Sequence, residues 1–182
     1  GLARTDPTAN VAGIRLETRH PKSLTHTELR RLLRAVHAGG DRRDIALVEL
    51  LAGTGLRVGE LLQLRVSDMT LRERSGWVVV RRGTHARYRP VPLTTPVRKA
   101  LTDHLAEHPN AGNPDAHLWL GERGPLRDRS SINRLLAKYA RQAQIPAPGP
   151  HILRHTFATH YLEANPSDLR GLAALLGHSS LN

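Results

Sequence analysis

The pattern of hydrophobic and polar positions predicts helices along most of the chain. The first begins at a capping box, in which Thr25 is followed three residues later by Glu28, and apolar residues then recur at helical spacing until Gly39 and Gly40. Gly55 is a natural left-handed cap for a second helix. Together these signals predict helices over about 25–39, 41–55, 58–64, 94–107, 130–143, 150–164 and 167–176.

Between residues 77 and 93 the period changes from helical to alternating. Two runs rich in β-branched residues, 77–80 and 88–93, enclose a short basic segment, which is typical of a β-hairpin. Residues 108–128 are rich in proline and glycine and are expected to be mostly loop. The predicted fold class is therefore mainly α with a small antiparallel β-hairpin sheet.

The length of the chain suits one domain with an attached arm. Residues 1–20 show no sustained period, so we expect a linker there and a domain over 21–182. Hydrophobic residues make up 39% of the 182 positions, which is enough for a core. No apolar run approaches the roughly 20 residues that a membrane helix needs, so we expect no membrane partner and a cytoplasmic location.

A strong excess of basic residues gives the first indication of a partner. The chain has 27 Lys and Arg against 16 Asp and Glu, a formal net charge of +11, and such a surface favours the phosphate backbone of nucleic acid. Aromatic residues are only 3% of the chain, which argues against the binding of single strands by base stacking. The lack of cysteine excludes disulfides, thiolate nucleophiles and cysteine-ligated zinc.

Arg57 lies where one predicted helix ends and the next begins. A forked guanidinium beside the free N–H groups of a helix N-terminus is well placed to hold a phosphate. The alternative is an exposed arginine that pairs with Glu60.

A second candidate is the helix face shared by His151, Arg154 and His155. Two histidines four residues apart can bind zinc, but the H-E-x-x-H motif is absent and Arg154 would place a cation beside the ion, so we expect no metal here. The alternative for these histidines is a partly buried structural role. His104 and His108, on an earlier helix, are expected to be exposed.

The predicted hairpin carries a third group of candidates. Arg81, Arg82, Arg87, Arg89 and His85 lie at its tip and flanks. Two-stranded ribbons enter DNA grooves and contact phosphates, so these arginines are candidate DNA-binding residues. The alternative is a solvated edge whose charge prevents aggregation.

In chain order these motifs resemble one family. Thr-Gly-Leu-Arg57-x-x-Glu60-Leu is followed by the basic hairpin ending in Val-Pro-Leu93, by His151-x-Leu-Arg154-His and by Leu-Leu-Gly-His178. This series closely resembles the catalytic domain of tyrosine recombinases, the phage integrase and Xer-like family, over residues 22–182. The resemblance implies that residues 1–20 are the linker from an N-terminal core-binding domain.

The resemblance also implies a reaction. A tyrosine attacks a phosphodiester of DNA and forms a 3′-phosphotyrosine and a free 5′-hydroxyl, without a metal or cofactor, and the enzyme assembles as a homo-oligomer on paired sites in site-specific recombination. By position, Arg57 and Arg154 would hold the non-bridging oxygens, and His151 would orient the phosphate and help to deprotonate the tyrosine. His178 would be a second hydrogen-bond donor, whereas Glu60 and His155 would steady their neighbours.

Two features depart from the family pattern. The family's hairpin lysine, which protonates the leaving oxygen, is replaced by Thr84, and His85 beside it is the candidate acid because arginine has a pKa above about 12. The nucleophilic tyrosine would fall near position 187, so the domain is expected to be truncated before it. We expect the chain's own tyrosines, Tyr88, Tyr139 and Tyr161, to be structural.

Three other functions compete with recombination. A DNA-binding module that has lost its chemistry would suit the missing lysine and tyrosine. A type IB topoisomerase would hold the phosphate in the same way, but would act as a monomer. A metal-dependent nuclease is disfavoured because the candidate site is cationic and lacks clustered carboxylates for Mg²⁺. The sequence of the target DNA is not encoded in any of these motifs.

Overall fold

The computed structural model describes residues 23–82 and 87–177, without the side chains of Arg82 and Arg87. The linker predicted over 1–20 and the site residues His85 and His178 lie outside the described residues. The α-helices are α1 (His26–Gly39), α2 (Arg42–Thr54), α3 (Val58–Leu62), α4 (Thr95–Ala106), α5 (Arg129–Ala143), α6 (Pro150–Ala164) and α7 (Leu169–Leu176), with a short 3₁₀ helix η1 (Val66–Asp68). The strands are β1 (Met69–Leu71), β2 (Gly76–Arg82), β3 (Arg87–Pro92), β4 (Leu120–Gly121) and β5 (Gly124–Pro125).

The predicted start of α1 is confirmed in atomic detail. The backbone N–H of Glu28 donates to Thr25 Oγ1 at 3.2 Å, and the Glu28 carboxylate accepts from the Thr25 N–H at 2.8 Å. Two backbone donors that the helix itself cannot satisfy are thus paired. Gly40 then ends the helix in the left-handed conformation, at φ 72°.

The predicted hairpin is also confirmed, and it forms part of a larger sheet. β2 and β3 pair in antiparallel register from Trp77 opposite Pro92 to Arg82 opposite Arg87. β1 adds a third antiparallel strand beside β2, and β4 pairs with β5 inside the segment that was expected to be mostly loop. These additional strands have only two or three residues each, too few for a recognisable alternating pattern.

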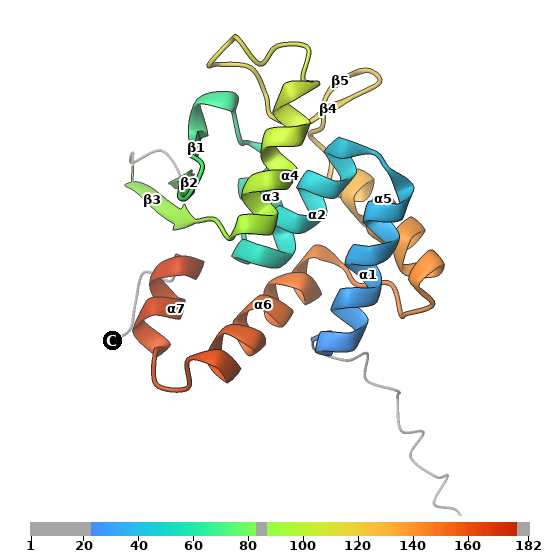
Figure 1. Cartoon of the computed structure of the whole chain (residues 1–182), viewed down its shortest axis with the longest axis vertical. Coiled ribbons are helices and arrows are strands. Elements are labelled where there is room, and N and C mark those ends of the chain that lie inside the picture. The colour runs from blue at the N-terminus through green and yellow to red at the C-terminus, as the bar shows by residue number, and fades with distance from the viewer. Residues whose placement is uncertain (1–22, 83–86, 178–182) are drawn as a thin grey trace, which may run out of the picture.

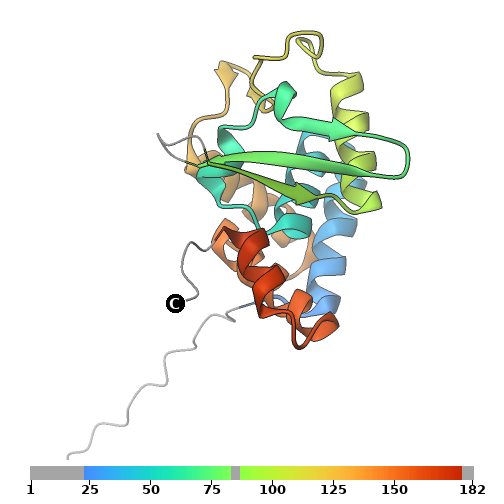
Figure 2. The same ribbon diagram turned by 90° about the vertical axis from the view of Figure 1, so that its left-hand side faces the viewer.

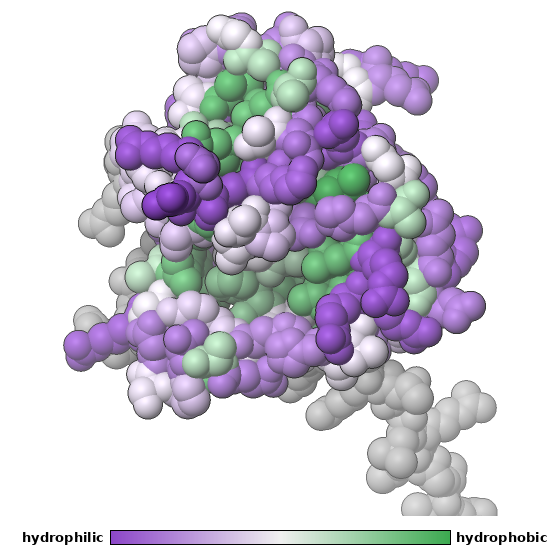
Figure 3. All heavy atoms as spheres, in the orientation of Figure 1, coloured by the Kyte–Doolittle hydropathy of each residue, from purple (hydrophilic) through white to green (hydrophobic). Residues whose placement is uncertain are grey.

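The three-stranded sheet lies along one side of the helical body (Figure 1). Figure 2 views the molecule from that side, with the sheet in front and α6 and α7 below it. On the face drawn in Figure 3, hydrophilic residues form most of the outer surface, and apolar residues show mainly in recesses between them. This distribution fits a helical body whose apolar faces pack inward.

The core is built around α2, which packs against α1, α4 and α6. The helix is buried on nearly every face; its fully buried apolar residues are Ala46, Leu47, Val48, Leu50 and Leu51. Tyr139 of α5 is also fully buried, in line with the structural role expected for it, and its hydroxyl donates to Asp44 Oδ2 of α2 at 2.9 Å. The central helix therefore fixes the positions of α5 and α6, which carry part of the site described below.

The expectation that His104 and His108 are exposed was wrong. The two residues are 7% and 6% exposed. His104 Nε2 bonds to the carbonyl of Leu118 at 2.9 Å, and His108 Nε2 bonds to the carbonyl of His117 at 3.1 Å. The segment after α4 folds back over this helix and supplies both acceptors, a long-range contact that helical periodicity does not reveal.

Among the described residues, none of the helices combines the length and the apolar character that a membrane crossing requires.

Candidate functional site

A cavity of about 750 Å³ opens where the start of α3 meets α5, α6 and α7. It is lined by Leu56, Arg57, Val58, Arg129, Asn133, Gly149, Pro150, His151, Arg154, His155, Ala158, Leu172 and Leu176. The predicted site residues Arg57, His151, Arg154 and His155 are all among them, although Arg57 is far from the others in the sequence. The fold thus brings two separated motifs to one cavity.

Arg57 is fixed through its backbone while its side chain remains half-exposed. Gly55 ends α2 in the left-handed conformation, at φ 63°, and Arg57 is the N-cap of α3. The Glu60 carboxylate accepts the Arg57 N–H at 2.8 Å and lies 3.3 Å from Arg57 Nη1. The side chain is 45% exposed; it pairs with Glu60, as one of the two interpretations expected, and it also lines the cavity.

Arg154 is held much more tightly than Arg57. It is only 9% exposed, and it donates from Nη1 to the Gly55 carbonyl at 2.6 Å and from Nη2 to the Leu176 carbonyl at 3.0 Å. Burial, followed by the charge of Arg57, lowers the pKa of Arg154 from its ordinary value, but a guanidinium stays protonated. Arg154 therefore carries a fixed positive charge at the junction of α2, α6 and α7.

His151 and His155 form a pair at the exposed edge of the cavity. Their Nε2 atoms are 2.9 Å apart, and their rings meet edge to face, with an interplanar angle of 85°. Such a contact needs one N–H donor and one nitrogen lone pair, so one of the two rings donates its Nε2–H to the Nε2 lone pair of the other. Both side chains belong to α6 and are one helical turn apart, as the sequence predicted.

The Glu60 carboxylate also binds a second arginine, Arg89, which the sequence pattern had indicated as a candidate DNA contact. Arg89 of β3 reaches Glu60 Oε1 and Oε2 from Nη1 and Nη2, each at 3.3 Å, and both side chains are only 12% exposed. Burial alone would raise the pKa of Glu60, but hydrogen bonds from Arg89 and Arg57 outweigh it and lower the pKa. Glu60 is therefore a carboxylate that links the hairpin to Arg57.

Arg89 also lies against the turn that follows α7. A Cβ on Gly177, which has φ 68°, would overlap the Arg89 guanidinium, so a larger residue there would be strained in its backbone and would have to displace this side chain. Arg81, in contrast, is 51% exposed and pairs with the buried Asp68 at 2.8 Å. Of the four hairpin arginines, these two have described side chains, and both have carboxylate partners.

The cavity also contains residues that the sequence patterns did not reveal. Arg129 and Asn133 come from the first turns of α5 and are exposed at the cavity wall. They belong to no motif, and their spacing of four residues fits any helix face. Only the packing of α5 beside α3 and α6 shows that they belong to the site.

None of the three tyrosines of the chain lines the cavity. Tyr139 is buried against Asp44, the Tyr161 hydroxyl donates to Asp168 Oδ2 at 2.6 Å, and Tyr88 is a 62% exposed residue of β3. Each has a position outside the site, in line with the structural roles expected for them.

The chain belongs to the phage integrase family, whose model matches residues 22–182. It is 39% identical over 186 residues to the tyrosine recombinase XerC of Neisseria meningitidis serogroup C / serotype 2a, and 37% identical over 198 residues to XerD of Mycobacterium tuberculosis. These alignments cover the whole chain but only 59% and 60% of the relatives. The chain thus spans about three-fifths of the length of these proteins.

Solved structures share the fold. The crystal structure of XerA recombinase matches with a TM-score of 0.78 at 36% identity, over 90% of this chain and 57% of that one. XerH recombinase in its pre-cleavage complex with difH substrate matches with a TM-score of 0.75 at 27% identity, over 89% of this chain and 49% of that one. The predicted fold, a tyrosine recombinase catalytic domain, is confirmed.

Proposed function

We propose that this domain carries out site-specific recombination of double-stranded DNA, by strand cleavage and rejoining through a 3′-phosphotyrosine and without a metal. The observation that carries the proposal is the cavity in which two arginines and two histidines meet. Membership of the phage integrase family and 39% identity to a tyrosine recombinase support the reaction type.

The two arginines suit the charge that this reaction develops. Negative charge on the non-bridging oxygens increases as a phosphodiester becomes pentavalent, and donors already in place stabilise it without reorganisation. Arg154, fixed by two carbonyls, supplies a stationary positive charge, and the half-exposed Arg57 supplies a fork that can reach the phosphate. In this proposal, Arg154 provides a fixed positive charge on one side of the phosphate, and the guanidinium of Arg57 contacts the phosphate from the other side.

The histidines suit the transfer of protons. We assign to His151 the roles of orienting the phosphate and helping to deprotonate the tyrosine, with His155 as the partner that shares its proton. His178 is the proposed second donor to the phosphate. On the hairpin, His85 is the proposed acid for the leaving 5′-oxygen, because an imidazole exchanges protons near neutral pH and arginine does not.

The nucleophile proposed here is a tyrosine near position 187, by the spacing of the family. The positions of Tyr88, Tyr139 and Tyr161 support this, since none of these residues lines the cavity. Cysteine is absent from the chain and offers no alternative nucleophile.

Double-stranded DNA is the proposed partner. XerH, at 27% identity, was solved with its difH substrate, and the net charge of +11 on this chain favours the same class of ligand. Arg57, Arg129 and the hairpin residues Arg81, Arg82 and Arg87 are the proposed phosphate contacts, whereas Arg89 is engaged by Glu60. Assembly as a homo-oligomer on paired sites, in the cytoplasm where chromosomal DNA is accessible, completes the proposal.

A covalent trapping experiment tests this function. The protein, extended through the proposed tyrosine, is mixed in EDTA with nicked duplexes whose binding arms are randomised, and adducts are recovered under denaturing conditions. The short nicked strand diffuses away after cleavage, so a recombinase leaves a stable adduct on a 3′-phosphate of a selected sequence. DNA binding without an adduct would instead indicate a binding module, and relaxation of plasmids without sequence preference would indicate a topoisomerase.

A further inference from the structure

A cluster of two histidines and a glutamate lies outside the proposed site. His26 is the first residue of α1, whereas His160 and Glu163 belong to the last turns of α6. At 3.6 residues per turn, His160 is on the opposite side of α6 from His151, which lines the cavity. The cluster therefore takes no part in the chemistry proposed above.

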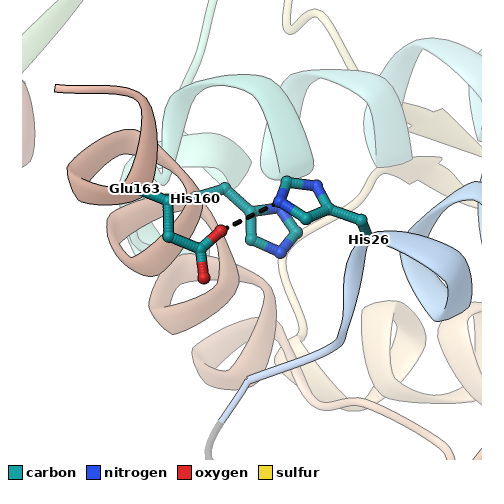
Figure 4. Close-up of side chains that lie close together, drawn as sticks. All are labelled: His26, His160 and Glu163. Carbon is teal, nitrogen blue, oxygen red and sulfur yellow. Dashed lines mark hydrogen bonds and ion pairs between the residues drawn. The ribbon is translucent and has the colours of Figure 1, made fainter.

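The three side chains present their ligand atoms to one another. Among the described residues, one nitrogen from each histidine and one carboxylate oxygen all lie within 4.8 Å of each other. His26 Nε2 is 2.9 Å from Glu163 Oε2, and the rings of His26 and His160 stack with centroids 3.7 Å apart. Figure 4 shows the end of the Glu163 carboxylate pointing at the His26 ring, with the His160 ring beside it.

A contact behind His160 determines which of its nitrogens is available. His160 Nε2 lies 3.1 Å from the carbonyl oxygen of Leu24. A carbonyl oxygen can only accept, so Nε2 carries the proton and Nδ1 keeps the lone pair. Histidines that bind metals commonly donate their other N–H to a carbonyl in this way, which fixes the ring and raises its basicity as a ligand.

We propose that His26 Nε2, His160 Nδ1 and a Glu163 oxygen form a binding site for a divalent transition-metal ion, with Zn²⁺ as the best fit. Two imidazoles and one carboxylate are an established donor set for zinc, with water as a fourth ligand. Mg²⁺ and Ca²⁺ prefer all-oxygen sites and do not match the two nitrogens.

The ion takes the place of the proton that now lies between His26 and Glu163. The side chains of these two residues are 66% and 55% exposed, so they can turn to direct their lone pairs at one ion, and the stacked rings open as they do so. The site joins the start of α1 to the end of α6, two segments more than 130 residues apart. An ion bound there stabilises the folded state, because the unfolded chain does not hold the three ligands together.

Thermal unfolding of this chain with ZnCl₂, after removal of metals with a chelator, tests the site at a pH where imidazoles are neutral. Zn²⁺ should raise the melting temperature by several degrees, and Mg²⁺ should not. In His26→Ala and in Glu163→Gln, which alter exposed side chains, Zn²⁺ should increase the melting temperature by less than half as much as in the wild type. His37→Ala is the matched control, because His37 is 53% exposed and bonds to a single carboxylate, Glu49, at 2.8 Å.

A second control separates this site from the other histidine pair. The Zn²⁺ effect should persist in His151→Ala, which removes the His151–His155 pair. If Zn²⁺ raised the melting temperature equally in the wild type and in both ligand variants, the proposal would be overturned. The contact between His26 and Glu163 would then be an ordinary ion pair. A rise lost only in His151→Ala would also overturn it, because the ion would then occupy the cavity.

Discussion

Arg57 and Arg154 bring the same charge to the cavity but contribute differently to the fold. Arg57 pairs with Glu60 and is 45% exposed, whereas Arg154 is 9% exposed and bonds to the carbonyls of Gly55 and Leu176. A guanidinium can donate in two directions at once, and an ammonium on a flexible stem cannot reproduce that fixed fork. The two residues should therefore differ when each is replaced by lysine.

The first prediction compares the stability of these two variants. Arg154→Lys should lower the free energy of unfolding by about 1–3 kcal/mol, because at least one buried carbonyl loses its donor. Arg57→Lys should change it by no more than about 0.5 kcal/mol, as for an exposed position. Urea denaturation followed by circular dichroism measures both. Equal effects of the two substitutions would show that the carbonyl contacts of Arg154 do not stabilise the fold.

The second prediction concerns the buried imidazole of His104. Burial is the main cause that lowers the pKa of His104 below its ordinary 6.5. The unfolded chain then binds a proton more readily than the folded one, so stability contributed by the neutral ring is present above pH 6.5 and is lost as the pH falls. We expect the free energy of unfolding to decrease from pH 7 to pH 5, by at most about 1.4 kcal/mol per pH unit from this one group.

Replacement of the ring tests this dependence. His104→Gln should flatten the pH dependence of urea denaturation between pH 7 and pH 5. Leu101→Ala, at a fully buried position of the same helix, should lower stability at every pH but keep the wild-type slope. An unchanged slope in His104→Gln would mean that the pH dependence comes from other groups.

At the scale of elements, the junction between α2 and α3 positions both arginines. Gly55 has φ 63°, and its carbonyl is an acceptor for Arg154. A Cβ at Gly55 would lie 2.5 Å from Phe157 Cδ1 and 3.0 Å from Leu176 Cδ2, so a side chain there meets both backbone strain and steric overlap. A Cβ at Gly59 in α3 would instead point into open space, which leaves room for a methyl group.

The third prediction uses these two glycines as a matched pair. Gly55→Ala should lower the free energy of unfolding by more than about 1 kcal/mol, because the left-handed conformation and the overlap with Phe157 both oppose a methyl group. Gly59→Ala should raise it by about 0.4–1 kcal/mol, because alanine reduces the freedom of the unfolded chain. Denaturant unfolding at one pH gives both values. A neutral Gly55→Ala would contradict the packing described for this junction.

The elements differ in how far the sequence predicts them. α1 and α6 carry local signals, a capping box and a proline in the first turn, and the structure confirms their predicted extents closely. β1, β4 and β5 are held by pairing with other strands, and the segment after α4 by contacts such as Trp119 Nε1 to the Leu61 carbonyl at 2.8 Å. Contacts between distant residues leave no period in the sequence, so these parts could not be predicted.

The candidate site shows the same division. Arg57, His151, Arg154 and His155 were indicated by local features, a helix junction and a shared helix face, and then by the order of their motifs, and the structure places all of them at the cavity. The position of Arg89 beside Glu60, and the presence of Arg129, depend on how β3 and α5 pack. These two features of the site depend on the tertiary structure and could not be predicted from the sequence.

At the scale of the whole molecule, the net charge of +11 should dominate DNA binding. The fourth prediction is that this chain binds duplex DNA weakly and with strong salt dependence, because each phosphate contact releases a counterion. Affinity measured by fluorescence anisotropy should fall steeply between about 50 and 200 mM salt. An affinity that stays flat over this range would remove the electrostatic explanation.

The contribution of one arginine to this salt dependence can be measured. Arg129→Gln should reduce the slope of log affinity against log salt by about one, as expected for one phosphate contact. Arg123→Gln removes the same charge from an exposed position that does not line the cavity, and should leave the slope nearer the wild-type value. Equal slopes for the two variants would place the DNA away from the cavity.

The cavity is proposed to stabilise a phosphodiester while a tyrosine attacks it. The most direct measurement of this role is the rate of covalent adduct formation on a nicked duplex, in EDTA, by the protein extended through the proposed tyrosine. Arg57→Lys should slow this rate by about 10²–10³. Arg42→Lys, at an equally exposed arginine at the opposite end of α2, should leave it unchanged. Near wild-type adduct formation by Arg57→Lys would contradict this role of the cavity.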